Sequence, residues 1–182
     1  QSGNTVPAPS FADEFDPAPS QTSAVAKTIT VTSDVLTLSI DTVGGDVVSA
    51  KLNQYAEELD SETPFQLLKN EQGHQFIAQS GLIGPQGIDL SSTTRPNYHV
   101  DADSYTLADG QDELRVPMTY SANGIEYTKT FIIKRNSYAI DVEFNVVNHS
   151  GSNATMGMYA HLRQNLQDSG GSLAMPTYRG GA

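Results

Sequence analysis

The fold is decided by residues 113–148, which read ELRVPMTYSANGIEYTKTFIIKRNSYAIDVEFNVVN. Apolar and polar residues alternate along three runs in this stretch, as expected of strands that bury one face and leave the other in water. The first two runs are joined by Asn123-Gly124, a pair that tolerates the positive φ angles of a tight hairpin turn. The second and third runs are separated by polar residues at 135–137. The stretch therefore predicts a three-stranded antiparallel meander.

Pro117 lies inside the first of these runs. Proline has no backbone N–H and cannot donate to a neighbouring strand on that side. We therefore expect the first strand of the meander to lie at a sheet edge or to carry a bulge.

Shorter runs on both sides of the meander predict further strands, at 28–32, 35–40, 47–52, 65–68, 75–79, 156–166 and 173–178. Gly44-Gly45-Asp46 is expected to turn a hairpin that spans 34–52. The segment 53–64 is expected to be an exposed connection, and 81–97 is expected to form a long irregular loop. Apart from one turn near 55–61, no helical periodicity appears. Strands that follow one another without helices between them predict an all-β sandwich.

The length of 182 residues is sufficient for one domain with its own core. Residues 1–26 are rich in Pro, Ser, Ala and Asp, a composition typical of a disordered linker. Residues 27–182 are then the sandwich domain. Because the chain ends just after a candidate strand, we expect this sandwich to be incomplete at its C-terminal end.

The formal net charge is −11, from 10 Lys and Arg against 21 Asp and Glu. An acidic surface repels phosphate backbones and anionic lipid heads, which disfavours nucleic-acid binding and peripheral membrane binding. We also expect no direct membrane insertion by this fragment. The chain has no cysteine, which excludes disulfides and thiol chemistry. It also lacks a run of the roughly 18 apolar residues that span a bilayer.

No catalytic, cofactor-binding or metal-binding residues are predicted. The four histidines are not at metal-ligand spacing, and they are His74, His99, His149 and His161. We expect His74 and His149 to be exposed, whereas His161 could face inward on its strand. The acidic residues between 101 and 112 do not fit a calcium loop, because Thr106 stands where glycine is needed and no Glu closes the loop.

Several runs together resemble the large periplasmic domain of the YidC family of membrane-protein insertases of Gram-negative bacteria. They lie at 32–36, 42–47, 63–68, 78–82, 113–120, 127–131 and 177–180, in one order over about 28–182. The resemblance implies an antiparallel β-supersandwich similar to galactose-mutarotase-like sandwiches. It also implies that the family domain continues beyond Ala182, and that residues 1–26 follow a transmembrane helix that is absent from this chain.

The function implied by this resemblance is that of a non-catalytic accessory domain without cofactors. The parent protein would lie in the bacterial inner membrane, with this domain in the periplasm, and would insert and help fold membrane proteins. Its expected partners are nascent inner-membrane proteins and accessory subunits of the Sec translocon. The Pro117 strand and the 81–97 loop are the expected contact points, because sheet edges accept extended segments by strand addition.

The alternative is a carbohydrate-binding or mutarotase-like sandwich. A mutarotase needs a general acid and a general base that converge on one sugar ring. His161 and Glu143 are the only candidates, and nothing in the sequence brings them together. A third interpretation is a spacer without partners. Glycan binding discriminates the alternative from the accessory domain, and translocon binding discriminates the accessory domain from the spacer.

Overall fold

The computed structural model describes residues 26–89 and 95–165. These residues form ten strands and no helix. The strands are β1 Thr28–Thr32, β2 Leu36–Asp41, β3 Asp46–Ala56, β4 Pro64–Glu71, β5 His74–Ile83, β6 Ser104–Thr106, β7 Glu113–Ala122, β8 Ile125–Lys134, β9 Ile140–Asn148 and β10 Gly157–Gln164. A helix long and apolar enough to cross a bilayer is therefore not found in the described ranges.

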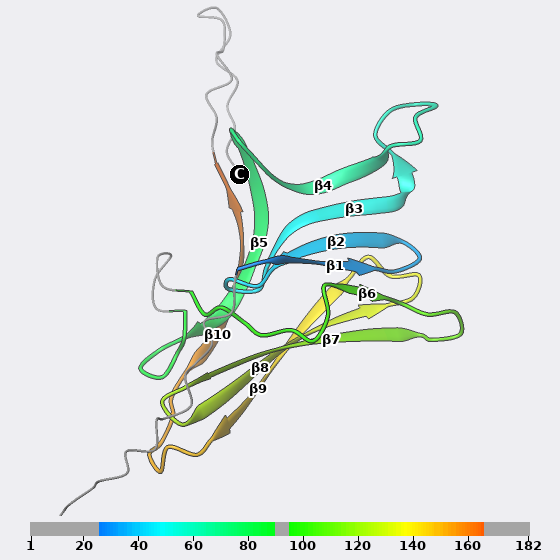
Figure 1. The fold of residues 1–182 in the computed structure, drawn as a ribbon. Coiled ribbons are helices and arrows are strands. Elements are labelled where there is room, and N and C mark those ends of the chain that lie inside the picture. Colours follow the sequence, from blue (N-terminus) through cyan, green and yellow to red (C-terminus); the bar gives the residue numbers. More distant parts are fainter. Residues whose placement is uncertain (1–25, 90–94, 166–182) are drawn as a thin grey trace, which may run out of the picture.

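The strands form two sheets that face each other (Figure 1). The larger has the order β10-β5-β4-β3-β2-β1-β6, and the smaller has the order β7-β8-β9. This confirms the predicted all-β sandwich. The smaller sheet is the predicted meander, with the Asn123-Gly124 turn at φ angles of 53° and 73°. Pro117 lies on β7, at an edge of this sheet, as expected.

The core lies between the two sheets, as one large and one smaller cluster of buried apolar side chains. Alternate residues of each strand point into it, so the period-two pattern of the sequence becomes one buried face per sheet. Its largest buried aliphatic and aromatic side chains come from both sheets and include Ile29, Val31, Leu38, Ile40, Val116, Met118, Phe131 and Ile133. Burying each such side chain contributes roughly 1.5–3 kcal/mol, and this burial holds the two sheets together.

Some boundaries differ from the sequence-based prediction. β3 continues to Ala56 and β5 continues to Ile83, so both connections after them are shorter than expected. β6 lies within the acidic segment 101–112, where no strand is predicted, and pairs in parallel with β1. The turn near 55–61 is not helical. The strand expected at 173–178 and the linker at 1–26 lie outside the described residues, except for Ala26.

Candidate functional site

A cleft of about 640 Å³ lies on the face of the larger sheet that points away from the smaller sheet. It forms where β5 diverges from β4, since β5 pairs with β4 only at 74–76 and with β3 only through Ala78 and Val47. Figure 1 shows β5 running across the direction of β3 and β4, with β10 alongside it. We call this depression the polar cleft. Its lining combines carboxylates, amides and two arginines with a few aliphatic side chains.

A β-bulge places Asp46 in the polar cleft. Ser39 pairs with Ser49, but Ile40 pairs with Val47, so β3 has one extra residue, Val48, at this point. Because one extra residue reverses the facing of all that follow, Val47 points into the core and Asp46 points outward. Without the bulge, a carboxylate would face the apolar core.

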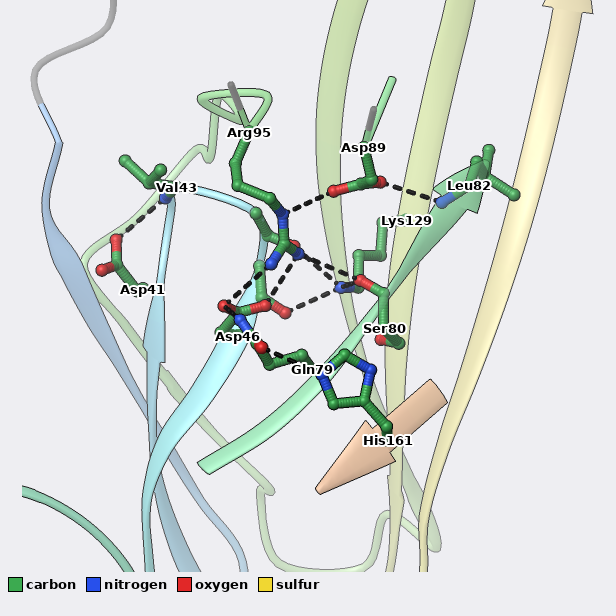
Figure 2. Close-up of polar contacts among 12 residues, drawn as sticks. Asp41, Val43, Asp46, Gln79, Ser80, Leu82, Asp89, Arg95, Lys129 and His161 are labelled. Atoms are coloured by element: carbon green, nitrogen blue, oxygen red, sulfur yellow. Dashed lines mark hydrogen bonds and ion pairs between the residues drawn. The ribbon is translucent and has the colours of Figure 1, made fainter. Parts of the chain in front are cut away.

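Arg95 binds Asp46 and a second carboxylate, Asp89 (Figure 2). Its Nε donates to Asp89 Oδ1 at 2.6 Å, and its NH2 group donates to Asp46 Oδ1 at 2.8 Å. The NH1 group donates to Asp46 Oδ2 at 3.1 Å. Only 9% of the Arg95 side chain is exposed, and none of the Asp89 side chain is. Asp89 also accepts a hydrogen bond from the backbone N–H of Leu82 at 2.8 Å.

Lys129 approaches the same group of residues from the core. Its side chain is fully buried, and Nζ donates to the carbonyl oxygens of Gly44, Gly45 and Ser80 at 2.7–3.0 Å. Three acceptors match the three N–H donors of an ammonium group. The rings of Phe131 and Phe144 lie 5.2 and 5.5 Å from Nζ. Asp46, Asp89, Arg95 and Lys129, which we call the buried ion cluster, thus bring together two carboxylates and two basic side chains.

The environment of the cluster shifts the pKa values of both cations. Burial lowers the pKa of Lys129 to about 7, and the nearby Asp46 and Asp89 carboxylates oppose that shift. Burial also opposes the charge of Arg95, but the same carboxylates outweigh it and raise the pKa of its guanidinium. The carboxylates therefore favour the charged form of each cation, against the cost of removing it from water.

Two glycines leave room for the buried ion cluster. A Cβ atom on Gly81 would lie 2.2 Å from Asp89 Oδ2, and one on Gly44 would lie 2.5 Å from the guanidinium of Arg95. Gly44 also has a φ angle of 77°, which disfavours any other residue. The Gly44-Gly45 turn is thus a packing requirement of the ion cluster as well as a hairpin turn.

β10 forms one wall of the polar cleft. Tyr159, His161 and Arg163 pair with Gly81, Gln79 and Ile77 of β5, so all three point to the outer face. The rings of Tyr159 and His161 stack with centroids 5.5 Å apart. His161 Nε2 lies 3.1 Å from Gln79 Oε1, and the amide of Gln79 donates to Asp46 (Figure 2). A chain of polar contacts therefore runs from β10 to the buried ion cluster.

The structure separates the two residues considered as a mutarotase pair. His161 is exposed on the outer face of the larger sheet, so the expectation that it could face inward is wrong. Glu143 pairs with Thr130 on the outer face of the smaller sheet and forms an ion pair with Arg115. The core lies between them, and they cannot act on one sugar ring. His74 and His149 are exposed, as predicted.

Sequence reasoning missed the residues of the buried ion cluster. A signal for Lys129 exists, since it occupies the same series of alternate positions along β8 as Ile125, Tyr127, Phe131 and Ile133, all of which face the core. A lysine at such a position must find buried acceptors. Arg95 and Asp89 lie outside the strands, and no pattern in their segment marks them. Within the described ranges, no three His, Cys, Asp or Glu side chains gather closely enough to hold a metal ion.

The YidC periplasmic domain family matches residues 28–182. The chain belongs to this family. It is 76% identical over its full length to the membrane protein insertase YidC of Vibrio atlanticus and 74% identical to that of Vibrio cholerae. It is 45% identical to the YidC of Haemophilus influenzae over 97% of its length. The chain covers 34%, 34% and 32% of these three relatives, about a third of each.

Membership in the YidC family confirms the resemblance on which the functional expectations rest. The family is by description a periplasmic domain, which also confirms the expected location. The similarity to galactose-mutarotase-like sandwiches stays a prediction.

Proposed function

We propose that this chain is a non-catalytic periplasmic accessory domain of an inner-membrane protein insertase. In this role it assists membrane-protein insertion by contacting nascent membrane proteins and accessory subunits of the Sec translocon. The observation that carries the proposal is the family match over 28–182, together with relatives that are themselves named membrane protein insertases.

A non-catalytic role is supported by the arrangement of the charged side chains. The donors of Arg95 and Lys129 are directed at two carboxylates and at backbone carbonyls of the chain itself. Groups used in this way stabilise the domain and are not free to move protons to or from a substrate. The separation of His161 from Glu143 removes the one acid–base pair that the sequence offered.

The two edges of the smaller sheet differ in their capacity to accept an extended segment. β7, the strand of Pro117, is partly closed because Thr119 exchanges backbone hydrogen bonds with His99 at 2.7 and 2.9 Å. β9 forms the opposite edge of the smaller sheet, and no further strand pairs with it among the described residues. Strand addition therefore fits β9 better than the Pro117 strand.

Binding to translocon subunits is tested with the complete parent protein in lipid nanodiscs. We expect purified Sec accessory subunits to bind it saturably, and removal of residues 28–182 to weaken that binding at least tenfold. A reporter membrane protein should still be inserted into proteoliposomes by the shortened parent, at a reduced rate. Unchanged subunit binding would contradict the accessory role, and complete loss of insertion would contradict the non-catalytic one.

We also infer that residues 27–182 are part of a larger sandwich, for which residues 1–26 serve as a linker. Met158 and Leu162 pair with Leu82 and Ala78 on the inner face of the larger sheet, yet they are 60% and 63% exposed. Leu162 lines an apolar groove of about 350 Å³, whose walls include Val142 of β9. Interior-facing apolar side chains on both sheets indicate that a further segment of the parent chain covers them.

If a further segment of the parent protein covers this groove, Leu162→Lys should have different effects in the 182-residue chain and in the parent protein. In the 182-residue chain the side chain is mostly in water, and the free energy of unfolding should change by less than about 0.5 kcal/mol. In the parent protein the same change should cost about 2 kcal/mol, because it buries a charge. Urea unfolding of the chain and limited proteolysis of the parent measure the two effects.

Leu59→Lys is the matched control, because Leu59 is 96% exposed on the turn after β3. It should leave both proteins unchanged. Equal and small effects of Leu162→Lys in the two contexts would show that nothing covers the groove.

A further inference from the structure

We propose that the polar cleft binds an uncharged polyhydroxylated ligand, such as a short neutral glycan, through the β10 wall and the side chains opposite it. This site is separate from the sheet edges considered above for protein partners.

The first reason is that the charged groups at the floor of the cleft already have partners within the protein. The carboxylates of Asp46 and Asp89 pair with Arg95, and Lys129 donates to backbone carbonyls. An ionic ligand would have to compete with contacts of 2.6–2.8 Å that are already made within the protein. A neutral ligand can bind against the floor of the cleft without disrupting these contacts.

The second reason is the mixture of free donors and acceptors around the rim. Asn70 Oδ1 accepts from Gln75 Nε2, so the Asn70 amide retains a donor and the Gln75 amide an acceptor. Asp41 uses one carboxylate oxygen to cap the Val43 N–H. Arg163 makes no hydrogen bond or ion pair with any described residue. Hydroxyl groups both donate and accept, and they therefore suit a rim on which the two kinds of group alternate.

The third reason is the stacked pair of Tyr159 and His161. Aromatic faces pack against the apolar C–H face of a sugar ring, and Ile77 and Val48 extend the apolar surface within the cleft. The volume of about 640 Å³ lies within the usual range for small-molecule sites.

An extended peptide fits this cleft less well. Peptides that bind sheets add to a strand edge, where backbone groups are unpaired. The floor consists of the face of β3 and β5, which are internal strands of the sheet. Recognition must therefore come from side chains, and these are the amide, carboxylate and guanidinium groups that pair with hydroxyls.

The test is isothermal titration calorimetry on the complete parent protein in lipid nanodiscs prepared without glycoside detergents. The probes are maltotriose, chitotriose and an uncharged capped Ser-Gly hexapeptide. We expect saturable heat from at least one trisaccharide, with a Kd of about 1 mM or tighter, and none from the peptide. Arg163→Gln and His161→Ala should each weaken the interaction about tenfold.

The matched controls make the same substitutions outside the cleft. Arg115→Gln changes an exposed arginine on the smaller sheet, and His99→Ala removes a side chain that is 70% exposed. Both should bind like the unaltered protein, and thermal melting should show all four variants folded. The proposal is overturned if neither trisaccharide gives saturable heat, if the controls weaken binding as much as the cleft variants, or if only the peptide binds.

Discussion

Replacement of Lys129 by methionine should lower the free energy of unfolding by about 3 kcal/mol. Methionine keeps the length and the apolar stem of the side chain, so the loss isolates the ammonium group. Without it, the carbonyl of Gly45 loses its 2.7 Å hydrogen bond. Below the Lys129 pKa of about 7, the Asp46–Asp89–Arg95 group also loses the positive charge that compensates its net negative charge. Urea unfolding followed by circular dichroism measures the change as a lower midpoint at an unchanged slope.

Lys134→Met is the control for this experiment. Lys134 lies on the same strand, but its side chain is 53% exposed and pairs with Asp141 in water. Such surface pairs contribute little, and the expected change is below about 1 kcal/mol. If the two methionine variants unfolded at the same urea concentration, the buried ion cluster would not be a stabilising element.

Arg95→Gln should have an effect of similar or greater size, about 3–5 kcal/mol. The substitution removes the donors that serve Asp46 and Asp89, and it leaves two carboxylates near one lysine. The loss is greatest at Asp89, because its completely buried carboxylate is left without its charged partner. The urea midpoint again measures the loss, with Arg115→Gln as a control that removes an exposed arginine from its ion pairs.

A second substitution tests whether the uncompensated carboxylate is the cause. Asp89→Asn keeps the size of the side chain and its acceptor oxygen for the Leu82 N–H, but it removes the charge. The double variant Arg95→Gln, Asp89→Asn should therefore lose at least about 1 kcal/mol less than the sum of the two single variants. Strict additivity would show that the two residues stabilise the domain independently.

These experiments also bear on the polar cleft. Arg95 comes from the segment between β5 and β6, and its side chain ties that segment to the Gly44 carbonyl at the β2–β3 turn at 3.1 Å. Asp89 ties the same segment to Leu82 of β5. The buried ion cluster therefore fixes two walls of the polar cleft in place, and a variant that weakens it should also disturb ligand binding there.

The sequence alone determined the strands of the meander and the class of the fold. Alternation along 113–148 requires one apolar and one wet face, and Asn123-Gly124 requires a tight turn, so local patterns were sufficient. Pro117 predicted an edge position or a bulge for β7, because a missing N–H is a local property, and the structure shows the edge position. The family could also be recognised, because short runs along 28–182 occur in one order.

The tertiary structure decided the site. Asp46 faces the polar cleft only because the bulge at Val48 shifts β3 by one residue, and a bulge depends on how two strands pair. Arg95 and Asp89 meet Lys129 from segments far apart in the chain, so their partnership has no signature in any one segment. His161 faces outward because of its register with Gln79 of β5. A strand's own sequence sets which residues alternate, but the pairing with its neighbour decides which set faces the core.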